Sequence, residues 1–132
     1  MYKTSLTGSL PSTENPPTAE PADFQLVDEN GDVVGAGVEA LLTYLGGTVC
    51  DDYFSDNAAT AICREMGFPG AVSWSSGQRY EQQSSMQITL DDVSCSGDEW
   101  DSCEYRTDHN CGHSEDIFLQ CSGKKIQFTT KQ

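Results

Sequence analysis

Six cysteines, all at or beyond position 50, constrain the fold of this 132-residue chain most strongly. An even number of cysteines in a short chain is typical of disulfide-stabilised secreted domains. No C-x-x-C pair occurs, so a redox motif or a four-cysteine zinc site has little support. The length suffices for one domain of about 100 residues with a modest core. We therefore expect a single extracellular, disulfide-stabilised domain. Its cysteines are Cys50, Cys63, Cys95, Cys103, Cys111 and Cys121.

The two ends of the chain differ from its middle in composition. Residues 1–22 hold four of the five prolines together with Ser, Thr and Glu, and their lack of apolar periodicity predicts a linker or stalk. Residues 123–132 form a short basic tail, either frayed or one added edge strand. The folded domain is expected over residues 23–122. No stretch reaches the ~18 apolar residues of a membrane span, so we expect no membrane insertion by this chain. Residues 1–10 lack a signal-peptide pattern, so we expect an export signal outside this sequence.

The charge of the chain limits its partners. It carries 21 acidic and 7 basic residues, for a formal net charge of -14. Between Phe24 and Cys121 the bases are Arg64, Arg79 and Arg106, too few to neutralise a run of phosphates, so nucleic acid is excluded as a partner. The acidic surface either attracts cations and basic protein surfaces or serves only to keep a secreted protein soluble.

Short strands separated by glycine-containing turns are predicted over residues 24–50. A further strand is predicted within residues 86–95, and its acidic pair is expected to end it in a loop. A final strand is predicted at 117–121. One helix is predicted at about 55–66. Ser55 or Asp56 is its N-cap candidate, and Gly67 is placed for a left-handed C-terminal stop. Cys63 falls on the apolar face of this helix and is expected to point inward as a disulfide partner.

The order of the motifs "GTVCDD", "AATAICREMGF", "ITLDDVSCSGDE" and "HNCGHSED" resembles that of the scavenger receptor cysteine-rich (SRCR) domain, over about residues 24–121. The resemblance implies an α+β fold in which a curved antiparallel β-sheet cradles one α-helix. It also implies the disulfides Cys50–Cys111, Cys63–Cys121 and Cys95–Cys103. Val34 and Phe68 stand where the eight-cysteine subgroup has a further bridge, so the chain is similar to the six-cysteine, group A-like members.

Three features depart from the family pattern. Gly46 stands where members usually have a tryptophan before "GTVC". Residues 38–46 keep only part of the "VEV" pattern associated with bacterial binding in salivary agglutinin-like members. The three arginines of the domain cannot form the arginine-rich face of members that bind polyanions.

A cation site is the main functional expectation. A Cys50–Cys111 bridge, as the resemblance implies, would bring Asp51 and Asp52 close to Glu115, where the three carboxylates would repel one another unless a divalent cation joined them. Similar family members use these positions for Ca²⁺ or Mg²⁺. The same reasoning gives a weaker second site, whose members are Asp91, Asp92 and Asn110. A solvated acidic surface is the alternative for both clusters.

Two histidines raise a catalytic alternative, with His109 or His113 as a general base. The nearby serines lie in no recognisable nucleophile motif, and a structural hydrogen bond is the preferred role for His113. We expect a non-catalytic extracellular recognition module, secreted or part of an ectodomain. Its partner would be a protein or glycan, including a microbial surface or polyanion reached through a bridging cation. A structural spacer domain and, last, a metal-dependent hydrolase are the alternatives.

Overall fold

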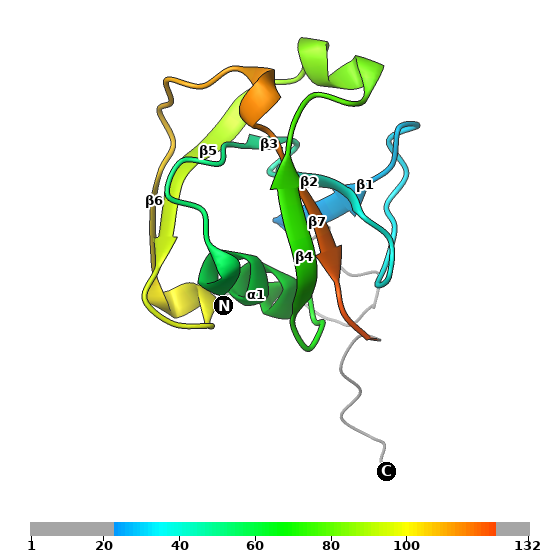
Figure 1. The fold of residues 1–132 in the computed structure, drawn as a ribbon. Helices are drawn as coiled ribbons and strands as arrows, with labels where there is room; N and C mark the ends of the chain where they lie inside the picture. The colour runs from blue at the N-terminus through cyan, green and yellow to red at the C-terminus, as the bar shows by residue number, and fades with distance from the viewer. Residues whose placement is uncertain (1–22, 124–132) are drawn as a thin grey trace, which may run out of the picture.

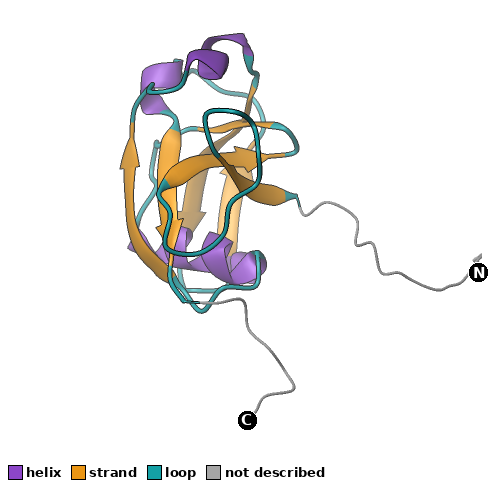
Figure 2. Cartoon of the chain, turned by 90° about the vertical axis from the view of Figure 1, so that its right-hand side faces the viewer, coloured by secondary structure: helices purple, strands orange, loops and turns teal. Residues whose placement is uncertain are grey.

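The computed structural model describes residues 23–123, so the predicted linker at 1–22 and nearly all of the predicted basic tail, residues 124–132, lie outside the described residues. Seven strands, one α-helix and three short 3-10 helices follow one another along this part of the chain (Figures 1 and 2). The strands are β1 (Phe24–Val27), β2 (Ala40–Tyr44), β3 (Gly47–Val49), β4 (Ala71–Ser76), β5 (Ile88–Cys95), β6 (Cys103–Arg106) and β7 (Ile117–Cys121). The helices are α1 (Asp56–Glu65), η1 (Glu81–Ser85), η2 (Trp100–Ser102) and η3 (His113–Glu115).

The sheet curls around α1, with β5 and β6 on one side of the helix and β4 and β7 on the other (Figure 1). Its strand order is β4-β7-β2-β3-β5-β6, and β1 pairs with β2 off this path. The α+β class and the cradled helix are confirmed. The sheet is mixed rather than wholly antiparallel, because β3 and β5 run parallel. Such pairing needs a long crossover connection, and α1, β4 and η1 provide it.

The turn between β2 and β3 explains two adjacent glycines. Leu45 and Gly46 both have positive φ, at 51° and 85°, as a tight hairpin turn requires. Gly47 is the first residue of β3 and lies against β5. A Cβ atom at Gly47 would stand 2.7 Å from the carbonyl oxygen of Gln87 and would also overlap the Thr89 side chain. The absence of a side chain therefore lets the two parallel strands approach closely.

Helix α1 begins and ends as the sequence predicts, to within one residue. The Ser55 hydroxyl accepts a hydrogen bond from the Ala58 amide at the first turn. At the other end Gly67 has φ of 97°, and the amide of Phe68 donates to the carbonyl of Cys63. This is the hydrogen bond of a Schellman stop, in which glycine takes the left-handed conformation. The buried face of α1 packs against β4, β5 and β7.

The three disulfides of the structure join the pairs that the resemblance implied. Cys63 on α1 is bonded to Cys121 at the end of β7, and Cys95 on β5 to Cys103 on β6. Cys50, directly after β3, is bonded to Cys111, just before η3. The first bridge ties the helix to the sheet, the second closes a hairpin, and the third brings two distant loops together. Within residues 23–123, no helix has the length and apolar character needed to cross a membrane.

Candidate divalent-cation site

Asp51, Asp52 and Glu115 converge because two distant segments are held together at Cys50. Asp51 and Asp52 follow Cys50 in the loop after β3, and Glu115 belongs to η3. A disulfide joins Cys50 to Cys111, and an isolated antiparallel bridge pairs Cys50 with Asp116. One carboxylate oxygen of Glu115 lies 3.5 Å from the Cys50 sulfur. The structure therefore brings the three members of the predicted first site together.

The geometry of this cluster fits one cation. One oxygen each from Asp51, Asp52 and Glu115 lies within 4.8 Å of the others. Oxygens bound to one Ca²⁺ at about 2.4 Å can stand no more than about 4.8 Å apart, so these three can reach the same ion. All three side chains are half-buried. The donor set is purely oxygen, because the nearby cysteine sulfurs are oxidised and carry no charge.

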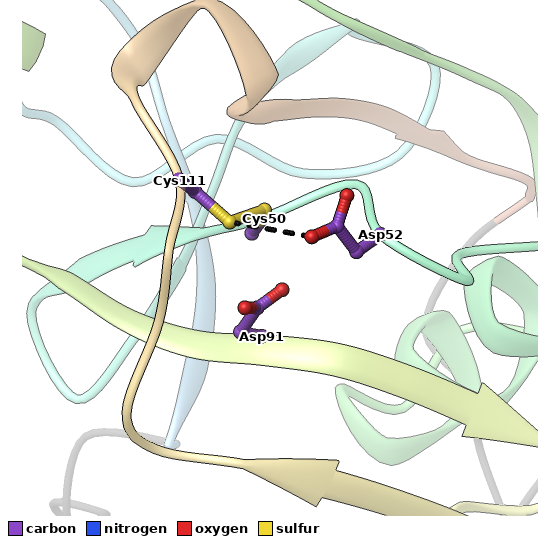
Figure 3. A group of neighbouring side chains, drawn as sticks. All are labelled: Cys50, Asp52, Asp91 and Cys111. Carbon is purple, nitrogen blue, oxygen red and sulfur yellow. Dashed lines mark hydrogen bonds between the residues drawn. A yellow bond between two sulfur atoms is a disulfide. The ribbon is translucent and has the colours of Figure 1, made fainter.

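A fourth carboxylate, Asp91, lies closer to Asp52 than the sequence indicated. Figure 3 shows the side chains of Asp52 and Asp91 directed toward the same space beside the Cys50–Cys111 disulfide. One oxygen of each lies within 4.8 Å of the other and of both sulfurs. Asp91 is only 3% exposed, and its Oδ1 accepts a hydrogen bond of 2.7 Å from the Asp92 amide. Asp52 thus stands between the two clusters that the sequence suggested separately.

The electrostatics of Asp52 follow from this crowding. Its pKa is raised above the ordinary value, first by desolvation and then by the negative charges of neighbouring carboxylates. Among these neighbours Asp91 has the largest effect, followed by Glu115 and Asp51. A positive ion placed among these groups would reverse the unfavourable interaction.

The second predicted cluster is only partly assembled. Asp91, Asp92 and Asn110 line a cavity of about 170 Å³, to which Arg106, Asp108 and His109 also contribute. Asp92 lies 3.9 Å from the guanidinium of Arg106 and outside the group formed by Asp52 and Asp91. Desolvation and the charge of Asp91 raise the pKa of Asp92, and Arg106 opposes them. Arg106 therefore competes with any cation for Asp92.

His113 takes part in a buried hydrogen-bond network next to Glu115. Its Nδ1 lies 2.8 Å from Oδ2 of Asp116, and its Nε2 lies 3.0 Å from the carbonyl oxygen of Met86. Oδ2 of Asp116 also accepts from the Gln83 amide at 2.9 Å, while Oδ1 is buried with no hydrogen-bond partner among the described residues. This network fixes η3, which agrees with a structural role for His113.

His109 differs from His113 in its surroundings. It is exposed, and its Nδ1 accepts a hydrogen bond of 3.2 Å from the Cys111 amide.

Two contacts at these clusters could not be predicted from the sequence: that of Arg106 with Asp92 and that of Asp91 with Asp52. Both depend on the pairing of β5 with its two neighbours, which local sequence does not reveal.

Comparison with known proteins identifies the family. The model of the scavenger receptor cysteine-rich domain matches residues 30–122. Lysyl oxidase homolog 2 of Xenopus laevis is 46% identical over 86 residues, a match covering 61% of this chain and 11% of that protein. A scavenger receptor cysteine-rich domain superfamily protein of Patiria pectinifera is 36% identical over 111 residues, covering 81% of this chain and 10% of that protein. The chain thus spans about a tenth of the length of these curated relatives.

Two solved structures are similar to this chain over part of its length. The third SRCR domain of murine neurotrypsin is 29% identical with a TM-score of 0.49, covering 77% of this chain and 99% of that one. The dimeric form of the SRCR domain of mouse MARCO is 27% identical with a TM-score of 0.46, covering 71% and 96%. SRCR domains are non-catalytic modules and are commonly extracellular. With the family model matching most of its length, this chain belongs to the scavenger receptor cysteine-rich domain family.

Proposed function

We propose that this domain is an extracellular, non-catalytic recognition module that binds its ligand with the help of a divalent cation, Ca²⁺ or Mg²⁺. The observation that carries the proposal is the convergence of three carboxylates, from Asp51, Asp52 and Glu115, within reach of a single ion. The resemblance to SRCR domains that hold cations at these positions supports it. The module would be secreted or part of an ectodomain, in keeping with its three disulfides.

The ion would also provide the contact with the ligand. Ca²⁺ prefers six to eight oxygen ligands, so three carboxylates leave positions that water fills and that ligand oxygens can take. A carboxylate, sulfate or sugar hydroxyl of a protein or glycan would then bind through the ion. This explains how a chain with a net charge of -14 could hold an anionic partner. An affinity for Ca²⁺ on the order of 10⁻⁴ to 10⁻³ M is expected of an extracellular module.

Asp91, Asp92 and Asn110 are proposed as a weaker second site. Asp91 is well placed for an ion shared with Asp52. Asp92 is the weaker member because Arg106 faces it. Binding at this second position would therefore saturate only at higher Ca²⁺ concentrations than binding at the first.

Calorimetric titration of Ca²⁺ into the wild-type chain and into Asp52→Asn and Glu115→Gln tests the first site. Each substitution keeps the side-chain shape and removes one charge, and we expect each to weaken binding at least tenfold. Glu65→Gln, at an exposed position on α1, is the charge-matched control and should bind as the wild type does. Equal binding by all four proteins would place the ion elsewhere, and no binding at millimolar Ca²⁺ would leave the acids as a solvated surface.

Ligand recognition needs a separate measurement. Protein and glycan arrays would be probed with the chain in Ca²⁺ and again in chelator. We expect binding that chelator removes and that Asp52→Asn abolishes. Ligand binding that persists in chelator would disprove the bridging role of the ion. A chain that binds neither Ca²⁺ nor a ligand would favour the structural spacer.

A further inference from the structure

A groove distinct from the three-carboxylate cluster lies along β6 and the outer face of β5. Its volume is about 300 Å³. Tyrosines, acids, a serine and an arginine line it, and these residues are Tyr53, Asp92, Ser94, Glu104, Tyr105 and Arg106. Ser94 and Glu104 face each other across the β5–β6 pair, which makes the floor of the groove part of the sheet. The groove is therefore built on a rigid element on one side and on the loop after β3 on the other.

The two tyrosines present aromatic surface to solvent. Tyr53 is 75% exposed and Tyr105 is 43% exposed, so the core gains little from Tyr53. Tyr105 stacks on Trp100 with ring centroids 5.3 Å apart and an interplanar angle of 15°, which holds its ring in place. Exposed aromatic side chains that are fixed in this way are enriched where proteins bind partners.

The backbone at the groove is held in an unusual conformation. Three non-glycine residues in the described part of the chain have positive φ, and Tyr53, at 62°, and Asp92, at 56°, both line this groove. An L-residue in the left-handed region costs about 1 kcal/mol or more, and the cost is greater for a bulky side chain. Folding alone gives no reason for a tyrosine at position 53, since its ring is mostly in solvent. The conformation does, however, direct that ring to the groove.

The charged residues in and beside the groove indicate which kind of ligand it would bind. Asp92 and Glu104 line the groove, and Asp91 and Asp108 stand beside it. Arg106 is the one cation of the lining, and Asp108 binds its guanidinium through two hydrogen bonds, of 3.2 and 2.8 Å. Acidic groups thus outnumber the engaged arginine in and beside the groove. An arrangement of aromatic faces with carboxylates suits a guest cation, and a planar guanidinium can both stack on a ring and pair with a carboxylate.

We propose that this groove binds an arginine side chain presented by a protein partner, against the ring of Tyr53 with its guanidinium paired to Glu104. The proposal goes beyond the cation-dependent function, because Tyr53, Glu104 and Tyr105 are not cation ligands. Binding here does not require Ca²⁺. A partner could accordingly present an acidic or sugar group to the ion and a basic side chain to the groove.

The test uses the 132-residue chain in chelator and the blocked tripeptide Gly-Arg-Gly, followed by the NMR signals of Tyr53, Glu104 and Tyr105. The same peptide with citrulline in place of arginine keeps the shape and removes the charge. We expect the arginine peptide to shift these signals and the citrulline peptide to leave them unchanged. Tyr53→Ala should weaken binding about two- to fivefold, as loss of an exposed cation–π contact does.

Matched variants separate the groove from general attraction to an acidic protein. Tyr53→Phe keeps the aromatic face and should bind as the wild type does, whereas Glu104→Gln should weaken binding. Glu65→Gln, which removes an exposed charge on α1, should have no effect. Equal binding by wild type and Tyr53→Ala, or shifts spread over other acidic surfaces, would overturn the proposal. Shifts with a neutral trisaccharide but not with the arginine peptide would show a sugar site instead. None of these outcomes depends on whether the chain binds Ca²⁺.

Discussion

Asp52 is placed unfavourably for folding, because like charges surround its carboxylate. Its carboxylate lies beside those of Asp91, Glu115 and Asp51, and both burial and these charges raise its pKa above the ordinary 3.8. A group whose pKa is higher in the folded state binds its proton more tightly there than in the unfolded chain. The stability contributed by this group therefore falls as the pH rises from about its ordinary pKa through the raised one.

Replacement of Asp52 by Asn should consequently stabilise the cation-free domain at neutral pH. The Tm of Asp52→Asn should exceed that of the wild type at pH 7 in chelator. The difference should shrink as the pH falls through the raised pKa of Asp52 toward the ordinary one, because the wild-type carboxyl then takes up its proton, and it should reverse in excess Ca²⁺ at pH 7. Thermal unfolding at several pH values, with and without Ca²⁺, measures this. A Tm for Asp52→Asn at or below the wild-type value in chelator would contradict the crowding argument.

Gln83 is the centre of the buried hydrogen-bond network beside the cluster of Asp51, Asp52 and Glu115. Its Oε1 accepts hydrogen bonds from the amides of Arg79 and Tyr80, and its amide nitrogen donates to Gly77 and Asp116. The side chain is fully buried, so its removal leaves several polar groups without partners. Gln83→Ala should lower the free energy of unfolding by about 3 kcal/mol, which urea denaturation measures.

A neighbouring glutamine provides the control for this variant. Gln78 is exposed and makes no hydrogen bond through its side chain among the described residues. Gln78→Ala should stay within about 0.5 kcal/mol of the wild type. A loss for Gln83→Ala no larger than this would mean that water enters the site and satisfies the remaining groups.

The members of the first cluster could be predicted from the sequence, whereas the contact between Asp52 and Asp91 could not. Asp51 and Asp52 adjoin one cysteine and Glu115 lies four residues beyond another, so the expected pairing brought them together. Asp91 reaches Asp52 because Val49 and Leu90 are partners in a parallel pair. Parallel neighbours are set by a long crossover, and nothing in the local pattern identifies them.

At the scale of elements, the helix was predictable because its signals are local. The N-cap at Ser55 and the stop at Gly67 are short-range features of the sequence. Strands β4 and β6 were missed for the opposite reason. Half of the sequence of β4, "AVSWSS", is serine, and β4 is defined by its pairing with β7, far along the chain. Strand β6 is four residues long and mostly exposed, so it buries no apolar face that a pattern could reveal.

The turn of the β2–β3 hairpin contains a strained residue, Leu45, whose replacement should stabilise the fold. Leu45 has φ of 51° and is 63% exposed, so its side chain gains little from the core while its backbone is in the left-handed region. Asparagine tolerates this conformation and is favoured before glycine in such turns. Leu45→Asn should raise the free energy of unfolding by about 1 kcal/mol, measured by urea denaturation. Leu45→Ala keeps the strain and should change stability little, and an equal gain from alanine would show that relief of strain is not the cause.

At the scale of the whole molecule, stability depends on the two long disulfide loops. Cys50–Cys111 and Cys63–Cys121 span 61 and 58 residues, whereas Cys95–Cys103 spans 8. A cross-link over about 60 residues restricts the unfolded chain by about 4 kcal/mol, and one over about 8 residues by about 2.5 kcal/mol. The domain is therefore expected to unfold when reduced at ordinary temperature.

Paired substitutions test this order of effects. Replacing Cys63 and Cys121 together by alanine should lower the free energy of unfolding by about 4 kcal/mol. The same replacement at Cys95 and Cys103 should cost about 2.5 kcal/mol. Chemical denaturation of the two variants measures the difference. A larger loss at the short loop, or free thiols at Cys63 or Cys121 in the native protein, would disprove this account.

The position of β7 at the end of the described chain has a consequence for biosynthesis. This strand lies between β4 and β2 in the sheet, and its last residue is the partner of the cysteine on α1. During synthesis the small hairpin of β5 and β6 can oxidise as soon as it emerges, whereas the sheet cannot close and Cys63 cannot meet its partner until β7 has left the ribosome. Until then Cys63 stands without its native partner among the cysteines already synthesised, so Cys63–Cys121 is the last of the three bridges that can form.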